Sequence, residues 1–373
     1  MIKVLFIIPN LGHGGAERVL VNLVNRMDPS RFDVTVQTMF DVGVYKDAFA
    51  PHVKYLGGFP VYFRGNSHAL KLLSPKQLYR HYVKKTYDVV ISYLEGSSAR
   101  LVSGCDDVRT KLVSWVHIEM EDKKYAAAPF RSLREASRCY ARFDRIVSVS
   151  SDVELAFRSV FPSERPSLVL YNTVEVDTVR AKSKEAVRDV DFKGNEIKLC
   201  SVAKLMAVKG YDRLMRVCAR LRQDGFPIHL YLVGKGEERE RLEILTKELN
   251  FAQWCTFVGF TDNPYKYVAN CDLYVCSSFR EGFSTAVTEA LIVGTPVVST
   301  CCSGATELLG EHNEYGIVTP NTEDGIYDGI KKILEDPGLL ERYKRLATIR
   351  GKRFSPDTTV KAVEQMLEEL VSE

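Results

Sequence analysis

The sequence lacks the features that mark several classes of protein. Its 373 residues contain no Cys-x-x-Cys pair, and the nine cysteines are scattered rather than spaced as a disulfide or zinc framework. This scattered spacing predicts that the cysteines are structural thiols and that the protein works in a reducing compartment. The apolar run near the N-terminus, residues 4–8, is shorter than a signal peptide core or a membrane span of roughly 20 residues. We therefore expect a cytoplasmic protein, held at most to the inner face of the plasma membrane.

No excess of charge of one sign stands out in the whole chain. Fifty-one lysines and arginines oppose 48 acidic residues, a net charge of +3, which is too balanced to indicate a nucleic-acid-binding protein. The charge is unevenly distributed, because residues 61–143 hold fifteen basic and eight acidic side chains. Tyr62, Phe63, Tyr79 and Tyr82 lie among them. This region suits contact with anionic lipid headgroups, and equally an ordinary solvated surface.

Short β-branched runs alternate with longer helical patterns along both halves of the chain. A polar stretch at residues 179–196 interrupts this alternation. The pattern predicts an α/β protein with two Rossmann-like, doubly wound parallel-sheet domains facing across a cleft. We expect an N-terminal domain at 1–178, a linker at 179–196, a second domain at 197–350, and a C-terminal helix within 351–373 that packs back on the first domain.

Three loops that follow predicted strands carry glycine or lysine. Gly12-His13-Gly14-Gly15 follows the first strand, and Gly234-Lys235-Gly236 follows a strand of the second half. Such glycines allow close approach to a phosphate or simply form a tight turn. Both loops lack the third glycine of a dinucleotide fingerprint, which weakens an NAD site. Lys204 and Lys209 follow the strand at 197–202, where two ammonium groups suit a diphosphate or are ordinary surface residues.

The most informative segment is residues 277–291, which follow the strand at 273–276. Gly282 and the Ser284-Thr285 pair predict a helix start with a capping hydroxyl and free N–H groups, suited to a phosphate. Glu281 precedes this start, and Glu289 lies within the helix. Two carboxylates so placed can accept hydrogen bonds from sugar hydroxyls. By spacing alone, they are equally two surface glutamates around a capped helix.

These residues carry a resemblance to a known family. Glu281 and Glu289 in their Glu-Gly-Phe-Ser…Glu-Ala-Leu setting resemble the Glu-x7-Glu signature of retaining glycosyltransferases of family 4, which have the GT-B fold. The other loops fall in the family's order. The resemblance implies that Glu289 holds the nucleotide ribose, while Glu281 holds the transferred hexose and the distal phosphate. The donor-binding set that it implies is Gly15, Lys204, Lys209, Gly234, Val258, Gly259, Phe260, Glu281, Gly282, Phe283, Ser284, Thr285 and Glu289.

The resemblance also implies catalytic roles for Glu281, Lys209, Lys204 and His117. His117 ends a predicted strand, where the family often has a histidine near the reacting sugar, although a lone histidine is more often structural. The family commonly has arginine where Lys204 stands, and lysine supplies a point charge rather than a bidentate fork. The Asp-x-Asp at 189–191 lies in the polar linker, so we expect no metal site and no cofactor.

The expected function is transfer of a hexose or N-acetylhexosamine from a nucleoside-diphosphate sugar to a saccharide acceptor with retention. Family usage favours UDP, with GDP second. Relatives of this kind often extend lipid-linked saccharides for capsule, exopolysaccharide or lipopolysaccharide, which agrees with a peripheral membrane contact. The alternatives are a GT-B-type sugar epimerase, an NAD-dependent oxidoreductase, and a catalytically inert sugar-binding relative.

Overall fold

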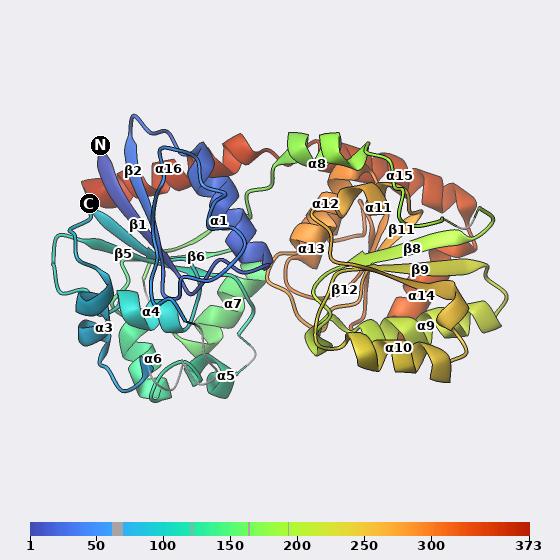
Figure 1. The fold of residues 1–373 in the computed structure, drawn as a ribbon, viewed down its shortest axis with the longest axis horizontal. Coiled ribbons are helices and arrows are strands. Elements are labelled where there is room, and N and C mark those ends of the chain that lie inside the picture. The colour runs from blue at the N-terminus through green and yellow to red at the C-terminus, as the bar shows by residue number, and fades with distance from the viewer. Residues whose placement is uncertain (62–69, 121, 163–164, 193) are drawn as a thin grey trace. The chain divides into compact units, whose positions relative to one another are not determined.

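A computed structural model describes residues 1–61, 70–120, 122–162, 165–192 and 194–373. The chain divides into two compact units (Figure 1). The first unit combines Met1–Thr173 with Pro356–Glu373, and the second is Val174–Ser355. Tyr62, Phe63 and Arg64 of the basic region lie outside the described residues.

The first unit is built on a parallel sheet with the strand order β3-β2-β1-β4-β5-β6-β7. Its central strands are apolar and buried on both faces, as expected where helices cover a parallel sheet. The three-residue strands β3 and β7, at the two edges, were not predicted, because each is too short for an apolar pattern. The bounds are β1 (Ile2–Ile8), β2 (Phe32–Thr38), β3 (Lys54–Leu56), β4 (Val89–Ser92), β5 (Lys111–Val116), β6 (Arg145–Ser148) and β7 (Ser167–Val169).

The second unit repeats the architecture with a sheet in the order β10-β9-β8-β11-β12-β13, again parallel. The prediction of two parallel α/β sheets is therefore confirmed. Short β13 was not predicted. The bounds are β8 (Ile197–Val202), β9 (Ile228–Val233), β10 (Cys255–Gly259), β11 (Leu273–Cys276), β12 (Val297–Thr300) and β13 (Ile317–Thr319).

Both sheets reverse their strand order once. In the first sheet the reversal lies between β1 and β4, and in the second between β8 and β11. Loops leave such a pair of strands in opposite directions, which opens a crevice at their carboxyl ends where ligands of open α/β sheets bind. We therefore expect a ligand site at the loops that follow β8 and β11 in the second sheet, and β1 and β4 in the first.

Helices pack on both sheets. In the first unit these are α1 (Gly15–Arg26), α3 (Pro75–Tyr82), α4 (Ser97–Val102), α5 (Lys123–Ala127), α6 (Leu133–Tyr140), α7 (Ser151–Val160) and α16 (Pro356–Ser372). The second unit has α8 (Val176–Ser183), α9 (Tyr211–Gln223), α10 (Arg239–Glu248), α11 (Tyr265–Ala269), α12 (Thr285–Val293), α13 (Ala305–Leu309), α14 (Glu323–Leu334) and α15 (Pro337–Gly351), with the 3-10 turns η1 (Ala207–Lys209) and η2 (Ala252–Trp254). In the described residues, no helix is both long and apolar enough to cross a membrane.

The boundary between the two units lies before the polar stretch, not within it. We expected a linker at 179–196, whereas the second unit begins at Val174 and includes α8. The reason is that Val176 and Val179 are buried with Tyr265 and Ile292 in a small apolar cluster of that unit. The C-terminal helix α16 belongs to the first unit and lies beside α1 (Figure 1).

Candidate functional site

The order reversal of the second sheet brings Lys209 and Glu281 together. Lys209 ends the turn η1 after β8, and Glu281 follows β11. The Lys209 Nζ atom lies 2.7 Å from Glu281 Oε1 and 2.9 Å from Oε2. The hydroxyl of Ser278 donates a third hydrogen bond to Glu281 Oε1, at 2.6 Å. Two of the predicted site residues, 72 positions apart, thus form one hydrogen-bonded cluster.

The loops that carry this cluster are docked on each other through their backbones. The Phe279 amide donates to the carbonyl of Val208 at 2.9 Å, and the Ser277 hydroxyl donates to the carbonyl of Lys209 at 2.9 Å. Gly210 has a φ of +63°, and a Cβ atom there would lie 2.2 Å from the Ser277 carbonyl oxygen. Only glycine fits both the left-handed backbone and this close approach.

Lys209 is held as a cation. Burial disfavours its charged form, but the adjacent Glu281 carboxylate more than offsets this and raises the pKa of Lys209 above its ordinary value. The side chains of Lys209 and Glu281 are 22% and 14% exposed, so water screens the pair only partly. A partly desolvated ammonium group beside a carboxylate can bind a phosphate and a sugar hydroxyl side by side.

Helix α12 supplies the second element of the site. Ser284 caps it, since its hydroxyl accepts a hydrogen bond from the Val287 amide at 3.3 Å. The first turn, which begins at Thr285, directs N–H groups toward the segment that contains Gly282, as suits an anion. Phe283 is 6% exposed, so its ring is buried in the unit.

Glu289 lies farther along α12 and is buried. The hydroxyl of Tyr265, which begins α11, donates to Glu289 Oε1 at 3.3 Å. Tyr265 and Ser278 are the contacts that the sequence reasoning missed. Ser278 stands in the segment singled out for Glu281, and its position after a strand was a usable signal. Tyr265 had none, since its contact with Glu289 depends on the packing of α11 against α12.

Lys204 and Gly234 occupy two loops that pack against each other. A Cβ atom at Gly234 would lie 1.9 Å from the Ala203 carbonyl oxygen, so this glycine is needed for loop packing. Lys204 itself is exposed, with Nζ 4.0 Å from Glu237 Oε2. An exposed pair of this kind contributes little to stability, which leaves the ammonium group available to an anion.

The predicted base-binding residues adjoin the same loops. Gly259 ends β10 with a φ of +86°, and its carbonyl accepts a hydrogen bond from the Gly234 amide at 2.8 Å. Phe260 follows with a half-exposed ring, and Lys235 Nζ lies 4.7 Å from the centre of this ring. Val258, Gly259 and Phe260 thus lie next to the loop of Gly234.

Gly15 and His117 lie in the first unit. Gly15 begins α1 directly after the β1 loop, and His117 follows β5. The His117 amide donates to Glu95 Oε2 at 2.9 Å, and its ring lies 4.7 Å from that of Tyr93. In the described part of the chain, His117 Nε2 is buried with no hydrogen-bond partner. Burial lowers the pKa of His117 to about 3, so its imidazole is neutral.

Asp189 of the Asp-x-Asp sequence has a structural partner. The Tyr267 hydroxyl donates to Asp189 Oδ2 at 2.5 Å, and this bond lowers the pKa of the Asp189 carboxyl. The carboxylate therefore helps to fasten the segment before β8 to the helix α11. This contact agrees with the interpretation of Asp189 as a structural residue.

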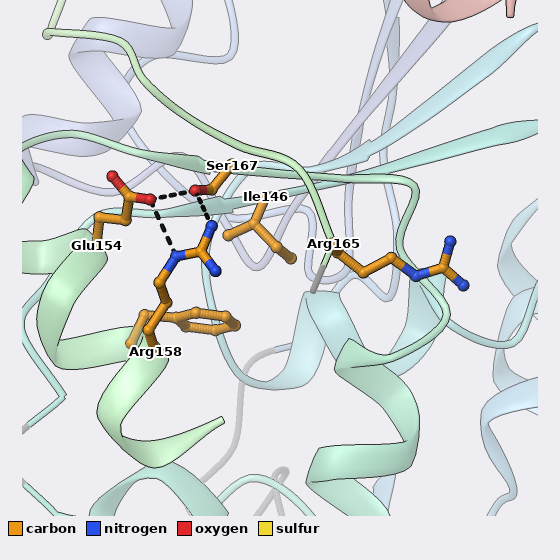
Figure 2. A pocket seen from close by; sticks show the side chains of 6 residues that line it. Ile146, Glu154, Arg158, Arg165 and Ser167 are labelled. Carbon is orange, nitrogen blue, oxygen red and sulfur yellow. Dashed lines mark hydrogen bonds and ion pairs between the residues drawn. The ribbon is translucent and has the colours of Figure 1, made fainter. Parts of the chain in front are cut away.

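The first unit has a cavity beside β6, α7 and β7 (Figure 2) that cannot hold a sugar. It holds about 10 Å³, the room of one water molecule. Arg158, Glu154 and Ser167 join in hydrogen bonds at its wall. Ile146 and Ser167 stand near the amino ends of β6 and β7, the edge opposite to the loops described above. It is a packing feature of that edge.

Two Rossmann-like parallel-sheet units in one chain are the architecture of the GT-B fold. Residues 182–350 match the family model for glycosyl transferases group 1, and residues 13–178 match the model for Glycosyltransferase Family 4. The two matches together span most of the chain. The first half of the chain therefore belongs to Glycosyltransferase Family 4 and the second half to the glycosyl transferases of group 1.

Several curated relatives are similar in sequence. An N-acetylgalactosamine-N,N'-diacetylbacillosaminyl-diphospho-undecaprenol 4-alpha-N-acetylgalactosaminyltransferase of Campylobacter jejuni is 34% identical over 58% of this chain and 58% of its own length. An uncharacterized glycosyltransferase of Haemophilus influenzae is 26% identical, covering 91% of this chain and 92% of that protein. A lipopolysaccharide 1,6-galactosyltransferase of Salmonella typhimurium is 23% identical, covering 89% and 92%.

Solved structures show the same fold. HepE of Anabaena, in complex with UDP, superposes with a TM-score of 0.78 at 22% identity, covering 98% of this chain and 100% of that one. Sucrose-phosphate synthase of Thermosynechococcus elongatus has a TM-score of 0.82 at 17% identity and covers 100% of both chains. At these identities the likeness concerns the fold.

Proposed function

We propose that the protein transfers a hexose or N-acetylhexosamine from a nucleoside-diphosphate sugar to a saccharide acceptor with retention. The observation that carries the proposal is the cluster in which Lys209 and Ser278 both donate hydrogen bonds to Glu281. It lies where the strand order of the second sheet reverses, beside the start of α12. UDP is the favoured nucleotide, with GDP second. HepE, which shares the fold, was solved in complex with UDP, and this supports UDP as a donor nucleotide.

In the proposed reaction the acceptor hydroxyl attacks the anomeric carbon on the face from which the diphosphate departs. The bond from this carbon to the distal phosphate oxygen breaks, and that oxygen takes the acceptor's proton. Lys209 and Lys204 stabilise the departing diphosphate together with the N–H groups at the start of α12. These positive groups make a metal ion unnecessary in the proposal. Glu281 and the backbone of Gly282, Phe283 and Ser284 hold the hexose.

The remaining residues have binding roles in the proposal. Glu289, oriented by Tyr265, accepts hydrogen bonds from the ribose hydroxyls. Val258, Gly259 and Phe260 contact the base. Gly15 of the first unit approaches the phosphates through its backbone. His117 of the same unit is a neutral hydrogen-bonding group for the reacting sugar.

We further propose a lipid-linked saccharide as the acceptor, in the synthesis of a cell-surface polysaccharide. The Campylobacter relative is named for an undecaprenyl-linked acceptor, and the Salmonella relative for lipopolysaccharide. A peripheral contact of the first unit with an anionic membrane would bring the enzyme to such an acceptor. The exposed basic side chains of α5 and α6 support this contact.

A screen of nucleotide sugars for released nucleotide tests the proposed function. Lys209→Ala and Glu281→Ala should each lower turnover about tenfold or more, because each removes a group that acts on the departing diphosphate or the sugar. Lys247→Ala, which removes an exposed lysine of α10, is the matched control and should leave turnover unchanged.

Near-normal turnover in both site variants would contradict the assignment. Binding of UDP, GDP and NAD separates the alternatives. Selective binding of NAD would indicate an oxidoreductase. If the protein binds UDP and converts the sugar of a UDP-sugar into an epimer without transferring it to an acceptor, it is an epimerase. Binding without any sugar release would indicate an inert relative.

A further inference from the structure

Arg213 is a buried arginine on α9, one turn after Lys209, and it is only 3% exposed. Its guanidinium donates twice to the carbonyl oxygen of Ser277, from Nε at 2.9 Å and from Nη2 at 2.6 Å. It also donates to Asn321, to the backbone carbonyl at 3.3 Å and to the side-chain Oδ1 at 2.7 Å. One side chain therefore ties the segment after β11 to the segment after β13.

Burying a guanidinium costs free energy unless its N–H groups are satisfied. Burial lowers the pKa of Arg213, as this cost requires. The hydrogen-bond acceptors that offset this free-energy cost are two backbone carbonyls and an amide oxygen, all of them neutral. The arrangement therefore differs from an ion pair, and its evident effect is to fix the position of the backbone at Ser277.

The same segment is held from a second side. The Arg213 guanidinium lies 3.8 Å from the centre of the Phe279 ring, in a cation–π contact. The Asn321 side-chain amide donates to the Phe279 carbonyl at 2.9 Å. Residues 277–279 are thus clamped between Arg213 and Asn321. Ser278 lies within this segment, and Glu281 follows two residues later.

We propose that Arg213 is a positioning residue for Glu281. By holding the Ser277 carbonyl and the Phe279 ring, it sets the backbone from which Glu281 reaches Lys209 and Ser278 reaches Glu281. The inference rests on the proposed function and deepens it, since it names what keeps the sugar-holding carboxylate in register with the phosphate-binding ammonium. Displacement by about 1 Å can lower a rate on the order of a hundredfold.

Lysine cannot replace this arginine, because an ammonium group lacks the planar fork that reaches Ser277 and Asn321 at once and stacks on Phe279. Arg213→Lys and Arg213→Met should therefore speed hydrogen exchange of the amides in residues 277–281 and lower turnover roughly tenfold or more. The Kd for UDP should change less than about twofold, since the base and ribose contacts lie elsewhere. A merely structural role would not separate turnover from UDP binding in this way.

Two further variants sharpen the test. Asn321→Ala removes the Asn321 side chain but leaves the two bonds to Ser277, so it should speed exchange of the same amides to a smaller extent. It also keeps the test open if the Arg213 variants do not fold. Arg216→Lys changes an arginine of α9 that pairs with Asp212 and Glu323. As the matched control, it should alter neither exchange at 277–281 nor turnover.

Unchanged exchange of residues 277–281 in the Arg213 and Asn321 variants would overturn the inference. Faster exchange with normal turnover would overturn it as well, because the clamp would then have no bearing on Glu281. If the wild-type protein released no nucleotide from any donor, the proposed function would fail. Exchange would still decide whether Arg213 holds the segment.

Discussion

His117 shows at the scale of a single residue how burial sets a charge state. Its Nε2 atom is enclosed, and its ring packs against Tyr93 and Trp115. The folded protein keeps this imidazole neutral down to a pH near its pKa of about 3, whereas an unfolded chain protonates histidine near pH 6.5. The stability that this residue contributes is complete above pH 6.5. It is lost as the pH falls toward 3, because only the unfolded state then binds the proton.

His117→Asn should flatten this dependence. Between pH 7 and pH 4.5, the free energy of unfolding of the wild-type first unit should fall by about 2 kcal/mol more than that of the variant. Fluorescence of Trp115 during urea unfolding, in a Trp254→Phe background, reports on the first unit, since the chain has two tryptophans. His312→Asn, at an exposed position of the second unit, is the control. Equal pH dependence in wild type and His117→Asn would contradict the burial argument.

At the scale of an element, α16 is fastened to the first unit by a buried carboxylate. Glu364 is 5% exposed, and it accepts hydrogen bonds from the Asp28 amide at 2.7 Å and from Arg31 Nη1 at 3.1 Å. Its neighbours Val363 and Leu367 are buried. The last helix of the chain is thus part of the core of the first unit.

Glu364→Ala should destabilise the first unit by about 1–3 kcal/mol, because it leaves the Asp28 amide without its acceptor. Glu369→Ala, on the exposed side of the same helix, should change the free energy of unfolding by less than about 0.5 kcal/mol. Urea unfolding followed through Trp115 measures both. A similar small effect of the two substitutions would show that α16 is held by apolar packing alone.

At the scale of the whole molecule, some basic side chains of the first unit form ion pairs with acidic ones, and others are exposed to solvent. Lys76 and Arg80 pair with Asp106, and the buried Arg100 pairs with Glu135. Lys123 and Lys124 of α5, and Arg134 and Arg138 of α6, are exposed. Figure 1 shows α3, α5 and α6 at the same end of this unit.

An apolar side chain stands beside these helices. Leu72 is 81% exposed, and Arg131 donates to its carbonyl at 2.8 Å. Basic residues around an exposed leucine suit the surface of an anionic membrane. Lys76, Arg80 and Arg100 have acidic partners, whereas the exposed basic residues of α5 and α6 face solvent. The membrane contact that we propose therefore rests on α5 and α6.

Replacing four basic residues by glutamine should reduce binding to vesicles of phosphatidylglycerol and phosphatidylcholine at least about tenfold, since each contributes on the order of 1 kcal/mol near such a surface. The substituted residues are Lys123, Lys124, Arg134 and Arg138. Co-flotation measures binding, and added salt should weaken it. The control replaces exposed basic residues of the second unit, Lys247, Lys332, Arg345 and Lys352. Equal binding by both variants would contradict a docking role for α5 and α6.

Much of the fold was predictable because its signals are local. The strands at Ile197–Val202 and Leu273–Cys276 were predicted with the bounds that the structure shows, since each is an apolar run between polar turns. The edge strands β3 and β7 carry no such run. The boundary near residue 174 was also missed, because the burial of Val176 and Val179 depends on partners about ninety or more residues away.

The sequence by itself determined two parallel α/β halves and the candidate residues of the segment around Glu281, because strand runs, helix caps and glycine turns are short-range patterns. Only the tertiary structure decided that Lys209 meets Glu281 and that Arg213 reaches Asn321, 108 positions away. The neutrality of His117 likewise follows from its surroundings rather than from its neighbours in the chain. Hydrogen bonding, burial and charge depend on distance in space, which the order of residues alone does not specify.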